Sequence, residues 1–258
     1  MKALLCAGIW ILSMAAEAQQ TVQLYAAGSL RAVMTEIGEA YAQATGNKVV
    51  GEFGASGLLR DRLDRGENAD LFASANMEHP RLLAQSGKGG KVRLFTRNHL
   101  CALAAPGLHI QSGNLVDAML IRGVKVGTST PKADPSGDYA FEVFDKADKL
   151  RPGSGVALRA KSVQLTGGPT SPKPPADRNL YAMLVSDGSA DIFLTYCTNA
   201  IAAQKENPAL QVVQLPPQLA VGAEYGMISF TSAGQTYGDF ILSPAAQAIF
   251  AKYGFAKP

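Results

Sequence analysis

The residues Tyr25-Ala26-Ala27-Gly28-Ser29-Leu30-Arg31 (YAAGSLR) join a predicted strand directly to a predicted helix. Residues 21–27 have the pattern of a strand. The apolar residues that follow recur at the spacing of one helix face, as Leu30, Val33, Met34, Ile37 and Tyr41. A single hydroxyl group, that of Ser29, stands at this junction. It is interpreted either as a helix cap or as a contact for a ligand.

The same arrangement recurs in the next segment of the chain. Residues 49–53 are predicted to form a strand that ends at Gly54-Ala55-Ser56-Gly57, and a helix follows over about residues 58–66. A third strand is predicted at residues 70–74. This βαβαβ order indicates an α/β fold with a parallel sheet and right-handed crossovers. Because parallel strands end at the same edge of a sheet, we expect Ser29 and Ser56 to lie close together.

The rest of the chain continues the alternation of strands and helices. Further strands are predicted at residues 100–105, 124–127, 191–197, 210–215 and 225–230. Helices are predicted from about residue 136, at residues 179–187 and at residues 237–253, with a break at Ser243-Pro244. Residues 150–175 are rich in glycine and proline towards their end and are predicted to form a loop. We therefore expect two α/β lobes around a cleft, residues 19–98 with 220–258 as the first lobe and residues 99–219 as the second.

Charge and composition exclude several classes of protein. The chain has 258 residues, of which 47% are hydrophobic and 17% are charged, with a net charge of +3. This excess of positive charge is small and is not gathered in a basic run, which argues against a nucleic-acid partner. The hydrophobic content argues against disorder.

The N-terminus has the pattern of a cleaved secretory signal. Met1-Lys2 supplies a positive start, residues 3–15 are apolar, and Ala16-Glu17-Ala18 is a cleavage site before Gln19. The apolar stretch is shorter than the ~20 residues that a membrane-spanning helix needs. We therefore expect residues 1–18 to be a signal peptide and the mature protein to be periplasmic.

Two cysteines remain after removal of this signal, Cys101 and Cys197. An even number of cysteines in an oxidising compartment is typical of a disulfide. Two buried free thiols on separate strands are the alternative, because the sequence does not give the distance between them.

The two serines suggest a site for an anion. The N-terminus of a helix carries a partial positive charge and free N–H groups, and the small residues beside each serine allow a ligand to approach the backbone. In open α/β sheets, ligands bind outside the carboxyl ends of the strands. The alternative is again structural, because serine is a favoured cap that contributes ~1 kcal/mol.

Four segments carry a resemblance to a known family: LYAAGSLRAVMTEI (24–37), EFGASGLLRDRL (52–63), ADLFASAN (69–76) and AAQAIFAKYGF (245–255). In this order they resemble the periplasmic molybdate-binding proteins of ABC transporters. The resemblance implies the type II periplasmic binding protein fold, with two α/β lobes and a ligand cleft. It further implies that molybdate or tungstate is held there by hydroxyls and backbone amides, without a cofactor and without catalysis. The expected partners are this oxyanion and a membrane permease, and we expect a monomer.

The resemblance also implies a set of ligand residues. Ser29 and Ser56 belong to the first lobe, and the N–H of Ser136 in Pro135-Ser136-Gly137, the N–H of Arg178 and the hydroxyl of Tyr196 belong to the second. These groups would bind the oxygens of the oxyanion and not its metal. Without the resemblance, Arg178 is interpreted as a solvated residue in the first turn of a helix, and Tyr196 as a core or edge aromatic.

Other features of the sequence depart from the family pattern or are structural. An arginine or aspartate near the ligand, at Arg178 or Asp177, is unusual and would favour another oxyanion. The role of the glycine- and proline-rich residues 167–175 is left open. Asp70 is expected at the start of a strand, bonded to backbone near the cleft.

Three alternatives to a molybdate-binding protein were weighed. The first is a binding protein of the same fold for a sulfate-like or other small anion. The second is a serine hydrolase, but Ser56 lacks the G-x-S-x-G spacing and no histidine follows His109. The third is a ferric-ion binder with clustered tyrosines, but the sequence has no adjacent tyrosine pair. His79, His99 and His109 lack the spacing of a metal site.

Overall fold

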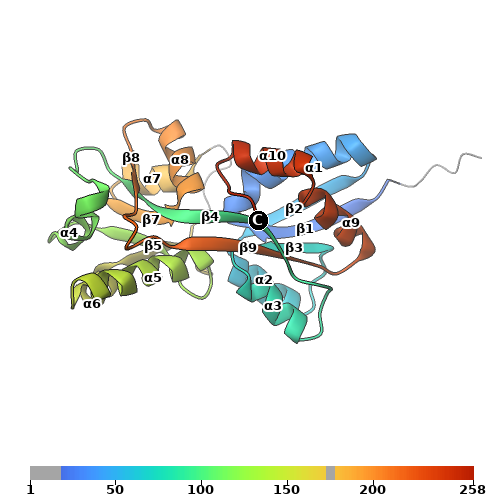
Figure 1. Cartoon of the computed structure of the whole chain (residues 1–258), viewed down its shortest axis with the longest axis horizontal. Helices are drawn as coiled ribbons and strands as arrows, with labels where there is room; N and C mark the ends of the chain where they lie inside the picture. The colour runs from blue at the N-terminus through green and yellow to red at the C-terminus, as the bar shows by residue number, and fades with distance from the viewer. Residues whose placement is uncertain (1–18, 173–177) are drawn as a thin grey trace, which may run out of the picture.

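The computed structural model describes residues 19–172 and 178–258. It shows two groups of strands, each covered by helices on both faces and joined by two long strands (Figure 1). The expected signal peptide and Asp177 lie outside the described residues. Within these residues, no helix combines the length and the apolar character that crossing a membrane requires.

The first group of elements confirms the predicted βαβαβ unit. Strand β1 pairs in parallel with β2 and with β3, and β9 joins antiparallel to β3. The elements of this group before the linking strands are β1 (Thr21–Ala27), a 3-10 turn (Gly28–Leu30), α1 (Arg31–Thr45), β2 (Lys48–Gly54), α2 (Ser56–Asp64), β3 (Leu71–Ser74) and α3 (Glu78–Gln85).

The second group lies between the two linking strands in the sequence. The linking strands are β4 (Arg93–Ala104) and β9 (Gly222–Ser229). Between them the chain forms a 3-10 turn (Ser112–Asn114), α4 (Leu115–Leu120), β5 (Val126–Ser129), α5 (Pro135–Leu150), α6 (Ser154–Lys161), β6 (Val163–Thr166), α7 (Leu180–Ser186), β7 (Ile192–Tyr196), α8 (Cys197–Glu206) and β8 (Gln211–Gln214). Helices α9 (Ser232–Ile241) and α10 (Pro244–Lys252) return to the first group.

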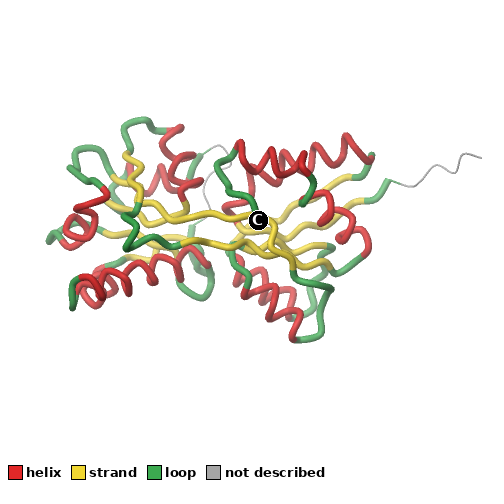
Figure 2. Tube along the Cα trace, in the orientation of Figure 1, coloured by secondary structure: helices red, strands yellow, loops and turns green. Residues whose placement is uncertain are grey.

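Strands β4 and β9 connect the two halves. The strand order is β2-β1-β3-β9-β4-β7-β5-β6, with β8 also paired to β4. The first part of β4 pairs with β9, and its second part pairs with β7 and β8. Figure 2 shows this strand pair running from one helix-covered group to the other. The chain is thus an α/β protein with two lobes; the boundaries at residues 98 and 219 stay a prediction.

The packing of α1 follows the predicted helix face. Its buried residues include Val33, Met34, Ile37 and Tyr41, which pack with Leu24 of β1 in the main core cluster. The predicted break near the C-terminus is also confirmed, because Ser243 caps α10 and Pro244 occupies its first turn.

The predicted loop over residues 150–175 is wrong in its first part. Residues Ser154–Lys161 form α6 and Val163–Thr166 form β6, which pairs in parallel with β5. The error has a physical reason: α6 presents only one fully buried large apolar side chain, Leu158, so its sequence lacks a clear apolar stripe.

His79 is a buried titratable group in the first lobe. It lies on α3 and is 5% exposed, and neither ring nitrogen has a hydrogen-bond partner in the described chain. Burial, reinforced by the charge of Arg60, lowers the pKa of His79 from its usual 6.5 to about 4. The unfolded chain therefore binds a proton at a higher pH than the folded chain does.

We predict that this histidine makes the fold sensitive to acid. The free energy of unfolding should fall by about 3 kcal/mol as the pH drops from 6.5 to 4, and the contribution is present in full above that range. Urea unfolding at pH 7 and at pH 4.5 measures it. His79→Leu should flatten the pH dependence, whereas the same change at exposed His109 should not. An equal pH dependence in all three proteins would contradict the prediction.

Candidate anion-binding site

The predicted site lies where the strands of both lobes end. Ser29 follows β1, Ser56 follows β2 after one residue, and Tyr196 is the last residue of β7. A cavity of about 280 Å³ lies between the lobes at this level. Its lining comes from the residues around the start of α3, the first turns of α5 and strand β9; it includes Asn76, Tyr139 and the carboxylates of Glu78, Asp138 and Glu224, and none of the five predicted ligand residues.

Neither predicted serine is a helix cap. The cap residues of the two helical starts are Ala27 and Ala55, and neither position has a side-chain capping bond. The Ser56 Oγ instead accepts the N–H of Ala75 at 3.1 Å, and Ser56 is 1% exposed. Because this oxygen accepts, the hydrogen of Ser56 is left for another acceptor. The cap interpretation is therefore wrong for both serines.

The Ser29 hydroxyl contacts a residue that the sequence did not single out. Its Oγ lies 3.0 Å from the hydroxyl of Tyr225 on β9. Ser29 is partly exposed, whereas Tyr225 is fully buried. Tyr225 on β9 thus contacts the Ser29 hydroxyl on one side, and the partial exposure of Ser29 leaves its other side accessible.

The N-terminus of α2 touches the second lobe directly. The N–H of Gly57 donates to the carbonyl oxygen of Ala133 at 2.8 Å. A Cβ atom at Gly57 would lie 2.4 Å from the carbonyl oxygen of Lys132, so only glycine allows this approach. One of the free N–H groups expected for the anion is therefore engaged by the other lobe.

The structure places Ser136 at the start of α5, but its N–H is engaged. Asp134 caps the helix, and its carboxylate accepts the Ser136 N–H at 3.0 Å. Burial raises the pKa of Asp134 to about 6, although this hydrogen bond opposes the shift. The Ser136 Oγ is buried and has no partner in the described chain. The hydroxyl of Ser136, more than its N–H, is thus available to a ligand.

Tyr196 is the last residue of β7, and two further tyrosines lie near it. Its hydroxyl is buried and makes no hydrogen bond of regular geometry in the described chain, and the hydroxyl of Tyr225 is the polar group that interacts with it. Its ring lies 5.6 Å from Tyr225 and 6.3 Å from Tyr139. The Tyr139 hydroxyl reaches the carbonyl oxygen of Ala75 across the cleft at 3.4 Å. Sequence reasoning missed this cluster because the three tyrosines come from three distant elements.

Burial keeps these tyrosines protonated. It raises the pKa of Tyr139, Tyr196 and Tyr225 well above the ordinary value of 10. Ferric ions bind the deprotonated phenolate, whereas a protonated phenol donates a hydrogen bond. The cluster therefore suits an anion better than a hard cation.

Arg178 is not brought to the other four predicted residues. Its Nε donates to Glu206 at 2.8 Å, and the neighbouring N–H of Asn179 donates to the same carboxylate. Glu206 is the last residue of α8, whereas Tyr196 directly precedes the first. A helix of 10 residues is about 15 Å long, so Arg178 lies at the far end of α8 from Tyr196. Its role as a ligand stays a prediction.

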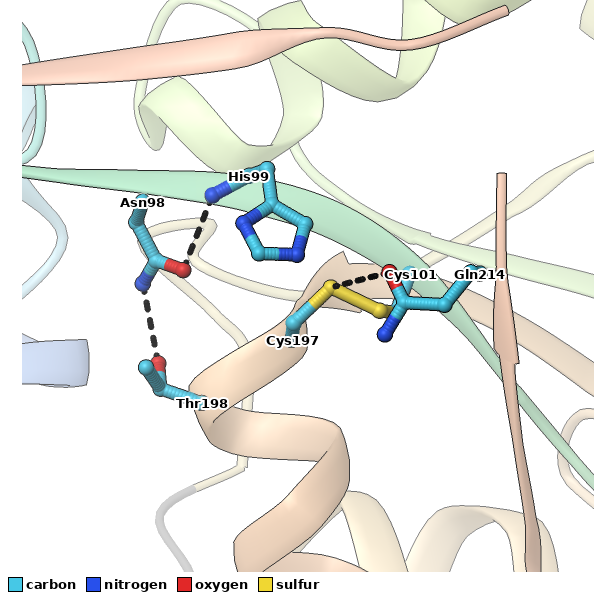
Figure 3. Close-up of a disulfide and its surroundings, with 6 residues drawn as sticks. All are labelled: Asn98, His99, Cys101, Cys197, Thr198 and Gln214. Atoms are coloured by element: carbon cyan, nitrogen blue, oxygen red, sulfur yellow. Dashed lines mark hydrogen bonds between the residues drawn. A yellow bond between two sulfur atoms is a disulfide. The ribbon is translucent and has the colours of Figure 1, made fainter. Parts of the chain in front are cut away.

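A disulfide joins Cys101 of β4 to Cys197 at the start of α8, which decides between the two alternatives for these cysteines (Figure 3). The Cα atoms are 4.8 Å apart. Cys197 follows Tyr196, so the bond fixes the chain beside the site to the linking strand. His99 lies close to both sulfurs, but the disulfide occupies them, and the group is not a metal site.

The remaining sequence expectations concern Asp70 and the hydrolase alternative. Asp70 stands before β3 and accepts the backbone N–H of Gln23 and the Thr231 hydroxyl, both at 2.7 Å. Asp70 is therefore at the start of β3, as predicted. The expectation that it lies near the cleft is wrong, because the site lies at the opposite end of β3, after Ser74. In the described chain, neither Ser29 nor Ser56 is hydrogen-bonded to a histidine.

Comparison with known proteins gives consistent results. The family model described as bacterial extracellular solute-binding protein matches residues 22–256. Uncharacterized protein PM1146 of Pasteurella multocida is 33% identical over 222 residues, 86% of this chain and 92% of that protein. Molybdate-binding protein ModA of Escherichia coli is 24% identical over 244 residues, 91% of this chain and 88% of that protein.

The solved structures confirm the fold class. The sulfate-binding protein SubI of Mycobacterium tuberculosis superposes with a TM-score of 0.75 at 21% identity, covering 92% of this chain and 86% of that one. The two-lobed type II fold that the resemblance implied is therefore the fold of this chain.

We predict that Gly57→Ala separates the lobes. The added methyl would meet the carbonyl oxygens of Lys132 and Ala133, which belong to backbone and cannot rotate away. Small-angle scattering should show a larger radius of gyration, with little change in melting temperature. Gly113→Ala is the control, because no atom lies within 4 Å of a Cβ placed there. An unchanged radius of gyration would count against the Gly57 contact as a brace between lobes.

Proposed function

Because the chain belongs to the bacterial extracellular solute-binding protein family, we propose that it is a periplasmic protein that captures a tetrahedral oxyanion. The proposed ligand is molybdate or tungstate, and the proposed partner is the membrane permease of an ABC transporter. The protein acts as a monomer, without a cofactor and without catalysis. Residues 1–18 are removed on export, and the lobes formed by residues 19–98 with 220–258 and by residues 99–219 close on the ligand.

One observation carries this proposal. The hydroxyls of Tyr196 and Ser136 are buried without partners in the second lobe, on the side where Ser29 and Ser56 end the strands of the first. A buried hydroxyl without a partner costs free energy, and Tyr196 and Ser136 differ from the equally unpartnered Ser154 and Tyr237 in following or preceding strand and helix ends that face the first lobe. These two hydroxyls of the second lobe and the two serine hydroxyls of the first suit a ligand with several oxygens.

The neutral character of these groups indicates how the ligand is chosen. A hydrogen bond to a charged oxygen contributes roughly 1.5–3 kcal/mol, so several together can offset the desolvation of a dianion. Neutral donors do not select by charge; they select by the number of acceptors and by the size of the anion. Molybdate and tungstate are larger than sulfate, which would leave some bonds stretched in a pocket of fixed size.

The alternative is a smaller anion such as sulfate. The donors proposed for molybdate serve any tetrahedral oxyanion, and a protein of similar fold is the sulfate-binding protein SubI. Pocket size decides between these ligands, because sulfate, molybdate and tungstate carry the same charge and the carboxylate of Asp134 beside Ser136 repels them alike when it is ionised.

We predict that molybdate and tungstate stabilise the mature protein in a thermal-shift panel. At 1,000 times the dissociation constant, binding stabilises the fold by ~4 kcal/mol, which raises the melting temperature by roughly 10 °C for a chain of this size. Sulfate should give a smaller shift, and perchlorate, which is tetrahedral but whose oxygens are weak hydrogen-bond acceptors, should give none. A larger shift with sulfate selects the alternative, and no shift with any dianion refutes the function.

We predict that the double variant Ser29→Ala and Ser56→Ala abolishes the shift while the unliganded protein still folds, with a melting temperature lower by only a few degrees because the Ala75 N–H loses its acceptor. Two donors to a charged ligand are lost, which lowers affinity by at least ~100-fold. Ser154→Ala is the matched control, because Ser154 also opens a helix and is buried with an unpartnered Oγ. A full shift in the double variant would place the ligand elsewhere.

A further inference from the structure

A chain of hydrogen bonds runs from Ser29 in the first lobe to α8 in the second. The Ser29 Oγ lies 3.0 Å from the hydroxyl of Tyr225, and the Asn98 Nδ2 lies 3.5 Å from the same hydroxyl. The Asn98 Nδ2 also donates to the Thr198 Oγ1 at 2.9 Å. Tyr225 and Asn98 stand on β9 and β4, the strands that link the lobes, and both are at most 4% exposed.

The direction of these hydrogen bonds is fixed at Asn98. Its Oδ1 accepts the backbone N–H of His99 at 2.9 Å (Figure 3). The amide nitrogen, which only donates, therefore faces Tyr225 and Thr198. Either hydroxyl could donate across the 3.0 Å contact between Tyr225 and Ser29, and the Asn98 amide that donates to the Tyr225 oxygen favours the arrangement in which Tyr225 donates to the Ser29 Oγ. Ser29 then accepts from behind, and its hydrogen is free towards the cleft.

Ser56 is held in the same way by a different group. Its Oγ accepts the N–H of Ala75, so its hydrogen is also free. Both serines of the first lobe thus accept one hydrogen bond and keep their own hydrogen free. Ser56 accepts from a backbone N–H, whereas Ser29 accepts from a side chain on a linking strand. Only the hydrogen bonds behind Ser29 continue into the second lobe, through Asn98 to Thr198.

We propose that Asn98 and Tyr225 are positioning residues that fix Ser29 as a hydrogen-bond donor to the bound oxyanion. The proposal rests on the proposed function and adds residues outside the predicted ligand set. Its consequence is selectivity: a first lobe that offers hydrogens favours an anion without protons of its own, since a protonated oxygen would find no acceptor there.

The variant Asn98→Asp tests the direction of the chain. The new carboxylate has the same shape and keeps the His99 bond, but at pH 8 it accepts where the amide donated. The Tyr225 hydrogen would turn to this carboxylate, and Ser29 would have to donate to Tyr225 instead of to the anion. We expect affinity to fall by ~10-fold to 100-fold, as for one lost bond to a charged group.

A mutant cycle separates this effect from simple charge repulsion. In the wild type, Ser29→Ala should weaken binding by ~10-fold or more; in the Asn98→Asp background it should cost less than about twofold, because Ser29 no longer donates to the ligand. Asn199→Asp adds the same charge one residue beyond Thr198 and should leave the cost of Ser29→Ala intact. Titration calorimetry at pH 8 with molybdate, tungstate and sulfate gives these affinities.

If Asn98→Asp does not fold, a second variant, Tyr225→Phe, tests the same proposal. Tyr225→Phe removes the donor behind Ser29 but keeps the ring contacts with Phe95 and Phe255. We expect affinity to fall by roughly threefold to tenfold, as for one lost neutral hydrogen bond. Tyr237→Phe is its control, because the hydroxyl of Tyr237 is also buried but has no partner in the described chain.

The outcomes separate the two proposals. A wild type that binds none of the three anions overturns the proposed function, and the positioning role with it. A wild type that binds one of them, with equal costs of Ser29→Ala in both backgrounds or with Tyr225→Phe equal to Tyr237→Phe, overturns the positioning role alone.

Discussion

The antiparallel pairing of β4 with β9 is the interaction on which the rest of the structure depends. These strands belong to both halves, so they set the distance and the angle at which the strand ends of one lobe face those of the other. Asn98 and Tyr225, on these strands, contact Thr198 and Ser29 in opposite lobes. The linking strands are thus both the mechanical connection and part of the polar surroundings of the site.

Burial gives the site its chemical character. The hydroxyls that surround it belong to phenols and serines in an environment that disfavours charge, so the phenols keep their protons. Glu78, Asp138 and Glu224 line the cavity between the lobes, and a further carboxylate, that of Asp134, caps α5 and holds the Ser136 N–H. Its raised pKa means that this group changes charge near pH 6, whereas the tyrosine and serine hydroxyls do not.

The sequence predicted what depends on local pattern. The periodicity from Leu30 to Tyr41 predicted the buried face of α1, and the βαβαβ order placed Ser29 and Ser56 at one sheet edge. It did not predict the cluster of Tyr139, Tyr196 and Tyr225, because nothing local indicates that three distant elements meet. The N–H of Arg178 as a ligand stays a prediction, because a count of residues back from Tyr196 carries no information on how the chain there packs; its side chain pairs with Glu206, at the other end of α8 from Tyr196.

The disulfide between Cys101 and Cys197 has a mechanical consequence. It closes a segment of 96 residues, and a cross-link over such a length stabilises a fold by roughly 4–5 kcal/mol in the chain-entropy model. Both sulfurs lie in the second half, so the bond ties that half to itself and leaves the cleft unbridged. The cross-link therefore restricts motion within the second lobe but not the motion of one lobe relative to the other. Bending between the lobes has to occur in the residues of β4 and β9 that lie outside the cross-linked segment.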